Sequence, residues 1–191
     1  MIRATAILAA FLIAACGGGS VVPEASQVAA EESLLFGIRR DAAVDCQPER
    51  DGLPAGALGA ITCLPENGLV TRLTLIRWDS EERLLEAYFT ALEDRGVQRA
   101  SGDCAAEAGG ESAYWPGEDD TGTGVPARQA CFRIGNESVA LATIPPTVLA
   151  EVHGNVEQPD ELLQWLWAGN QDVPGGPTIW NADGPINIEK G

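Results

Sequence analysis

Five cysteines are the side chains whose chemistry is most closely limited by their places in the chain. A thiol can accept an acyl group or form a disulfide, and pairs spaced as C-x-x-C commonly hold zinc. Cys16 ends an apolar N-terminal run, and the other four are Cys46, Cys63, Cys104 and Cys131. No two of them have C-x-x-C spacing, so the cysteines predict lipidation and disulfides and no metal site.

The N-terminal segment has the pattern of a bacterial export signal. Arg3 precedes an almost wholly apolar run that is shorter than the roughly 20 residues a helix needs to cross a bilayer. The run ends in IAAC at 13–16, which resembles the lipobox of bacterial lipoproteins, whose cysteine receives a diacylglyceryl group. We expect residues 1–15 to be a signal peptide and Cys16 to carry palmitate or similar acyl chains. The alternative is an ordinary secretory signal with a chance cysteine.

Charge restricts the partners of the chain. It has 12 basic and 28 acidic side chains, a net charge of −16, and its one lysine is Lys190. Nucleic-acid surfaces need clustered Lys and Arg, and anionic lipid headgroups repel an acidic protein. We therefore expect no nucleic-acid partner and attachment to the lipid bilayer through acylated Cys16. This predicts an extracytoplasmic location in the cell envelope, and the inner and outer membranes are not distinguished.

The four cysteines after Cys16 form an even set, which in an exported protein predicts two disulfides. Three connectivities are possible, and spacing alone does not choose among them. We favour Cys46 with Cys63 and Cys104 with Cys131, because each pair then lies inside one of two similar structural units. A zinc site is disfavoured further because the chain has a single histidine.

Periodicity and turn residues predict one α+β domain at 28–169, between a flexible tether at 16–27 and a loose tail at 170–191. The clearest element is a helix in DSEERLLEAYFTALEDRG, where Asp79 is expected to cap the N-terminus and Gly96 to end the helix. The other expected helices lie at 27–37, 147–153 and 159–168, the expected strands at 58–64, 69–78, 128–134 and 138–144, and a long polar loop at 101–126.

These elements repeat one order in residues 46–96 and 104–169: cysteine, loop, cysteine in a strand, second strand, helix. We interpret the order as a structural duplication of a β-hairpin followed by a helix. The predicted fold is a four-stranded antiparallel sheet with the helices packed on one face and two disulfides.

Several segments of the chain resemble a cysteine-paired extracytoplasmic domain found in bacterial Ser/Thr protein kinases and in stand-alone lipoproteins. The resemblance rests on LLFGI ahead of DCQP, on ITCLP, WDSEERLLEAYFTAL, GDC and ARQACF, and on LLQWLW, which together extend from residue 34 to residue 167. It implies the same pairing of the four cysteines and a domain that senses or binds a ligand.

Motifs of the common enzyme classes are absent from the sequence. There is no G-x-S-x-G, no H-E-x-x-H and no glycine-rich loop between a strand and a helix. His153 is the sole imidazole, and at the end of the expected helix it is explained as a C-cap. The acidic GEDDTGTG at 117–124 lacks the alternating ligands of an EF-hand loop, so we expect a solvated loop and no cofactor.

Tryptophans supply the remaining candidates for a binding surface. Trp115 lies in the long loop, and Trp165 and Trp167 lie in the last helix, where two positions turn by about 200° and the two side chains cannot both face the core. An exposed tryptophan can stack on sugars or peptides, and the alternative is that it packs beneath the C-terminal tail. The sequence thus favours a membrane-anchored, non-enzymatic binding or sensory domain for a protein, peptide or glycan; the alternatives are an envelope hydrolase using carboxylates and a structural envelope protein.

Overall fold

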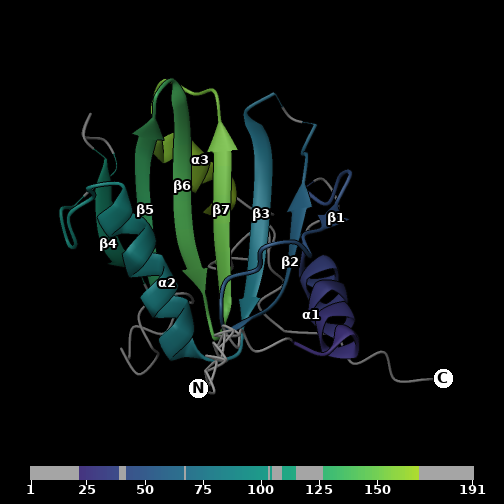
Figure 1. Cartoon of the computed structure of the whole chain (residues 1–191). Coiled ribbons are helices and arrows are strands. Elements are labelled where there is room, and N and C mark those ends of the chain that lie inside the picture. The colour runs from purple at the N-terminus through teal and green to yellow at the C-terminus, as the bar shows by residue number, and fades with distance from the viewer. Residues whose placement is uncertain are drawn as a thin grey trace, which may run out of the picture.

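The computed structural model describes residues 22–38, 42–66, 68–102, 104, 109–114 and 127–167. In this part of the chain seven strands form one antiparallel sheet in the order β1-β2-β3-β7-β6-β5-β4 (Figure 1). The elements are α1 (Glu24–Gly37), β1 (Gln47–Pro48), β2 (Ala57–Cys63), β3 (Val70–Trp78), α2 (Glu81–Asp94), β4 (Gly110–Tyr114), β5 (Ala127–Ile134), β6 (Glu137–Ile144), β7 (Val148–Gly154) and α3 (Asp160–Trp167).

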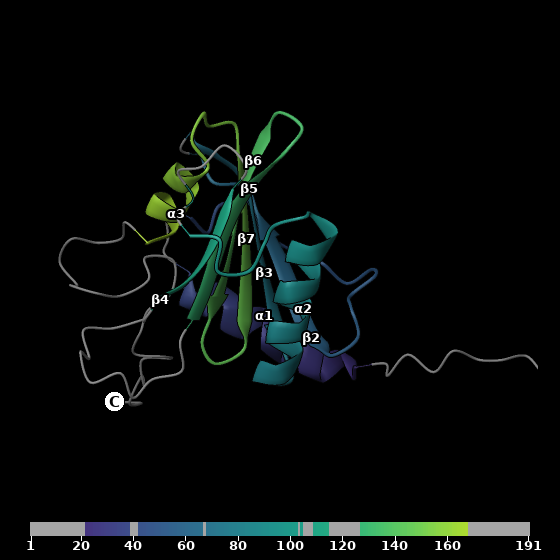
Figure 2. The ribbon, with the colours of Figure 1, turned by 90° about the vertical axis from the view of Figure 1, so that its left-hand side faces the viewer.

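Helices cover both faces of the sheet. Seen along the sheet, α2 lies on one side and α3 on the other (Figure 2). Leu34 of α1 and Leu162 of α3 share one core cluster with Leu73 and Leu75 of β3. The second cluster joins the α2 side chains Leu84, Tyr88 and Leu92 to the opposite sheet face. The central strands β6 and β7 are therefore buried on both sides, and the expectation of helices on one face is wrong.

The sheet also has more strands than the predicted four. The expected helix at 147–153 is strand β7, which pairs with β3 on one side and β6 on the other. Short apolar runs do not distinguish a helix from a strand buried on both faces, and only three residues separate the end of β6 at Ile144 from the start of β7 at Val148. The second unit is thus not a hairpin followed by a helix, and His153 is a strand residue rather than a helix C-cap.

Two further strands lie at the edges of the sheet. β4, within the expected loop at 101–126, pairs with β5, and the two-residue β1 pairs with β2. β4 has the sequence GESAY, whose Gly, Glu and Ser have low strand propensity, so pairing with a neighbour forms this strand more than intrinsic preference does.

The hairpins, the helices at both ends of the domain and α2 agree with the predicted elements within a few residues. The N-cap of α2 is Ser80 instead of Asp79, because the Ser80 hydroxyl accepts the Arg83 backbone N–H. Disulfides join Cys46 to Cys63 and Cys104 to Cys131, the favoured pairing. The α+β class and the presence of two disulfides are confirmed.

Several predicted features lie outside the described residues. They are the signal peptide at 1–15, the acylated Cys16, the acidic loop at 117–124, Trp115 and the tail at 170–191. Among the helices that are described, none combines the length and apolar character needed to span a membrane.

Candidate functional site

A groove runs along one side of α2, and it arises because this helix carries two different apolar stripes. Leu84, Tyr88 and Leu92 recur at helical spacing and pack into the core. Ala87 and Ala91 lie on a neighbouring stripe of the same helix, where their small, partly buried side chains line the recess. The helix is thereby held close to the sheet on one side and leaves a recess on the other.

This recess, here called the α2 groove, has a volume of about 430 Å³, which lies within the usual range for small-ligand sites. Its floor consists of Ile76 and Trp78 of β3 and Leu149 of β7. Pro54 and Ala55, in the turn before β2, form the wall that faces α2. The α2 groove is therefore apolar at its floor and on both walls.

Trp78 places one polar group beneath this apolar surface. Its side chain is 4% exposed, and its indole N–H has no hydrogen-bond partner in the described part of the chain. Indole can only donate, so a carbonyl or carboxylate oxygen is the group that would satisfy it. A buried donor without a partner costs about 1–3 kcal/mol, and such a group calls for a specific explanation.

Charged side chains stand at the rim of the α2 groove. Arg83 and Glu86 lie toward the start of α2 and form an exposed ion pair at 3.3 Å, and Asp94 lies at the helix end. The aliphatic part of Arg83 also lies against Gly56, whose φ of +92° is permitted by the absence of a side chain. The lining therefore carries two acidic groups and one basic group.

A second polar cluster lies at the far end of the same sheet face, around His153. Its ring is nearly buried, with Nδ1 2.9 Å from Glu137 Oε2 and Nε2 within hydrogen-bond distance of Glu151 Oε1. Arg72 Nη2 lies 2.9 Å from Nε2. A carboxylate only accepts, so both ring nitrogens donate to their glutamates when the imidazole is protonated.

The hydrogen bonds between His153 and its two glutamates shift the pKa values of His153 and Glu151. Burial lowers the pKa of His153, but the hydrogen bonds to Glu151 and Glu137 outweigh it and the pKa is raised above 6.5. The hydrogen bond from His153 lowers the pKa of the Glu151 carboxyl below 4.5, against the opposing effect of burial. Both changes favour the ion pair. They are the reverse of what a neutral histidine base and a protonated carboxylic acid at neutral pH would need.

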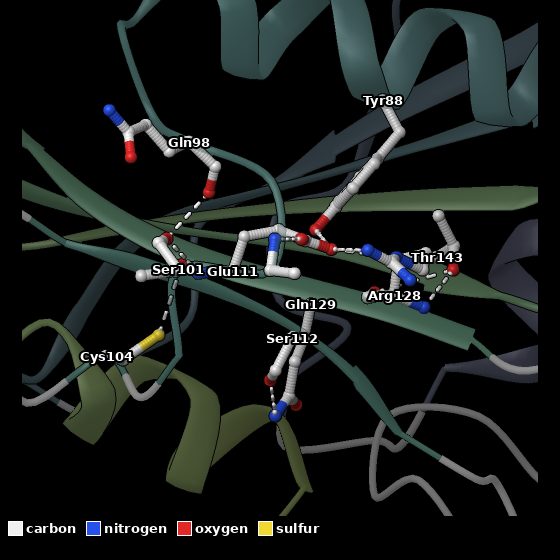
Figure 3. A network of polar contacts seen from close by, with 11 residues as sticks. Tyr88, Gln98, Ser101, Cys104, Glu111, Ser112, Arg128, Gln129 and Thr143 are labelled. Atoms are coloured by element: carbon white, nitrogen blue, oxygen red, sulfur yellow. Dashed lines mark hydrogen bonds and ion pairs between the residues drawn. The ribbon is translucent and has the colours of Figure 1, made fainter.

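A third network ties β4 and β5 to the segment that follows α2 (Figure 3). Glu111 is fully buried, and its Oε1 accepts from Arg128 Nη2 at 2.6 Å and from the Tyr88 hydroxyl at 3.4 Å. Its Oε2 accepts the backbone N–H of Ala100, and its own backbone N–H donates to Ser101 Oγ. Both carboxylate oxygens are satisfied from within the fold, so this network holds the segment in place.

The buried carboxylates of the described chain are both paired with arginine. Besides Glu111, Glu31 of α1 accepts from Arg50 Nη2 at 3.0 Å. A carboxylate committed to a guanidinium is a poor general acid or base. Within the described residues, no group of three or more His, Cys, Asp or Glu side chains is placed to hold a metal ion.

The tryptophans predicted to face a ligand lie on the other face of the sheet. Trp165 and Trp167 are both half-buried and pack against the core cluster that contains α1 and α3. The Trp167 indole N–H donates to Gln129 Oε1 at 2.7 Å, so its polar atom is engaged within the fold. Neither side chain is among those that line the α2 groove.

None of the residues that line the α2 groove was predicted from the sequence to face a ligand. The signal that could have indicated the α2 groove is the pair of alanines at 87 and 91 beside the stripe of large apolar residues on the same helix, together with Trp78 at the end of a strand. Comparison of the chain with protein-family models, with curated proteins and with solved structures found no match. The resemblance to kinase ectodomains stays a prediction.

Proposed function

We propose that this chain is a bacterial lipoprotein, held at a membrane by acylated Cys16, whose extracytoplasmic domain binds a ligand in the α2 groove without catalysing a reaction. The observation that carries the proposal is the apolar recess itself, about 430 Å³ in volume and open to solvent, on the central strands β3 and β7. A ligand with an apolar body would cover this surface. The lipidation half of the proposal rests on the IAAC motif and the preceding apolar run.

Binding is favoured over a carboxylate hydrolase for reasons of charge pairing. A hydrolase of that type needs one protonated and one ionised carboxyl group facing a substrate cleft. Glu31 and Glu111, the buried candidates, are each bonded to arginine, and the pKa of Glu151 is lowered by His153. These arrangements stabilise the fold. A structural envelope protein would leave the α2 groove without an occupant.

Lipidation is tested by mass spectrometry of the protein from its native membrane. The proposal predicts a mature N-terminus at Cys16 that carries acyl chains and a Cys16→Ser protein that is released from the membrane fraction. An unmodified N-terminus, or Cys16→Ser protein that fractionates with membranes as before, would show that this half is wrong.

Ligand binding is tested by filling the α2 groove. Ala91→Trp places a large side chain in the recess, and Glu82→Trp adds the same side chain at an exposed position of α2 outside the groove lining. Each lipidated protein is purified from membranes, and co-purified molecules are quantified by mass spectrometry. We expect at least one species to be lost with Ala91→Trp and kept with Glu82→Trp, both proteins having the far-ultraviolet circular dichroism of the wild type. The same co-purified species in all three preparations would contradict the proposal.

A further inference from the structure

We infer that the occupant of the α2 groove is an extended peptide segment in which one apolar side chain is flanked, two residues away on each side, by lysine or arginine. This inference rests on the proposed function and adds to it the ligand class. Three features of the groove carry it: its apolar floor, the distance between its acidic ends and its surplus negative charge.

The distance between the acidic groups selects an extended chain. Glu86 and Asp94 are eight residues apart on one helix, which corresponds to about 12 Å along the axis at 1.5 Å per residue. In an extended peptide the side chains at i, i+2 and i+4 point the same way, and i and i+4 are about 13 Å apart. Basic side chains at i and i+4 therefore match the two ends of the groove, and the side chain at i+2 lies over its middle.

The charges at the rim favour a cationic occupant. Arg83 is the one basic residue of the lining, and its partner is Glu86, so its charge is balanced locally. Exposed ion pairs of this kind are weak, and a basic residue of the ligand can share or replace Arg83 at Glu86. Asp94 adds a further negative charge, and the whole chain carries a net charge of −16. An acidic ligand would be repelled both by the rim of the α2 groove and by the net charge of the whole chain.

The floor selects an apolar side chain. Ile76, Trp78 and Leu149 present hydrocarbon and aromatic surface to the middle of the groove. An apolar side chain at i+2 buries this surface favourably, whereas a polar side chain there would lose its contacts with water.

The experiment is a titration of the mature chain, with Cys16→Ser to keep it in aqueous solution, followed through the NMR signal of the Trp78 indole N–H. Trp78→Phe assigns that signal. The probes are the pentapeptides KSLSK, ESLSE and KSSSK, each acetylated at the N-terminus and amidated at the C-terminus. Only the first combines basic ends with an apolar centre.

The inference predicts that KSLSK binds and shifts the Trp78 N–H signal, because Trp78 lies on the groove floor. ESLSE and KSSSK should bind at least about tenfold more weakly. Asp94→Lys should weaken KSLSK binding by about three- to tenfold, whereas Glu66→Lys, at an exposed turn, should leave it unchanged. Raising the salt concentration should weaken it as well.

Two results separate the failure of this inference from the failure of the proposed function. Equal binding of ESLSE and KSLSK would overturn the cationic ligand class and leave the α2 groove as a binding site. If none of the peptides binds, the inference is wrong, and the co-purification test with Ala91→Trp then decides independently whether the groove binds another class of ligand. A Trp78 N–H signal that stays in place at saturation would also overturn the inference.

Discussion

Ile76 of β3 and Leu149 of β7 are directly paired across the antiparallel ladder, and both side chains lie on the floor of the α2 groove. The two strands occupy the third and fourth places in the seven-stranded sheet, so the floor belongs to its centre. A site built on paired strands keeps its geometry better than one built on loops. The α2 groove is therefore expected to be preformed in the free domain.

The first prediction concerns the packing of that floor. Leu149→Ala should lower the free energy of unfolding by about 2 kcal/mol, because Leu149 borders a recess and loses fewer contacts than a leucine enclosed on all sides. Leu141→Ala, in the same core cluster but away from the groove lining, should cost about 3–5 kcal/mol. Urea denaturation measures both. A larger loss for Leu149→Ala than for Leu141→Ala would show that the recess is closed.

The second prediction concerns the Glu111 network. Glu111→Ala leaves Arg128 partly buried without its carboxylate and removes the acceptor of the Ala100 N–H, so we expect a loss of about 3–5 kcal/mol in unfolding free energy. Glu93→Ala, at an exposed position of α2, should change it by less than about 0.5 kcal/mol. Similar values for the two variants in urea denaturation would mean that the network contributes little to stability.

The third prediction concerns pH. The pKa of His153 is raised above 6.5 in the folded state, so its stabilisation is complete below pH 6.5 and is lost as pH rises through the folded-state pKa. The pKa of Glu151 is lowered below 4.5, so its stabilisation is present above pH 4.5 and is lost as pH falls through its folded-state value. The pair therefore contributes its full stabilisation between pH 4.5 and pH 6.5.

His153→Gln tests this window by urea denaturation at about pH 5.5 and about pH 8.5. The difference in unfolding free energy between wild type and variant should be larger at the lower pH. The exposed substitution Glu32→Gln serves as a control whose effect should be small at both. A difference for His153→Gln that grows as pH rises would contradict the assignment of a protonated ring.

The fourth prediction compares two glycines in the left-handed region. Gly109 has φ +80°, and a Cβ there would meet the Cys131 carbonyl oxygen, whereas Gly52 has φ +76° and open space around it. Both substitutions to alanine should cost about 1–2 kcal/mol because they place a Cβ in the left-handed region. Only Gly109→Ala adds a clash of that Cβ with the backbone. Thermal unfolding should show a clearly larger loss for Gly109→Ala. Equal losses would indicate that β4 can move away from β5 at little cost.

The sequence predicted those elements whose signal is local. The stripe of Leu84, Tyr88 and Leu92 and the turn residues of the two hairpins depend on near neighbours, and these elements lie where expected. The favoured pairing of the cysteines, one of three possible, is the one that the structure has. Local periodicity describes such segments because one face of each is buried and the other is not.

The errors arose where the tertiary structure decides. β7 is buried on both faces at the centre of the sheet, so its apolar run carries no period of two and was assigned to a helix. β4 has weak strand residues and forms by pairing with β5. The α2 groove depends on how Ala87 and Ala91 of one helix pack over β3 and β7. A local sequence pattern does not show where a helix packs on a sheet.

The central claim, that the α2 groove is the binding surface, is tested most directly by photo-crosslinking in living cells. A benzophenone amino acid replaces Thr90, an exposed residue of the groove lining, and in a second protein replaces Glu32 on the opposite side of the sheet. The account predicts a discrete adduct at position 90, which Ala91→Trp abolishes, and none at position 32. No adduct at position 90, or the same adduct at both positions, would contradict it.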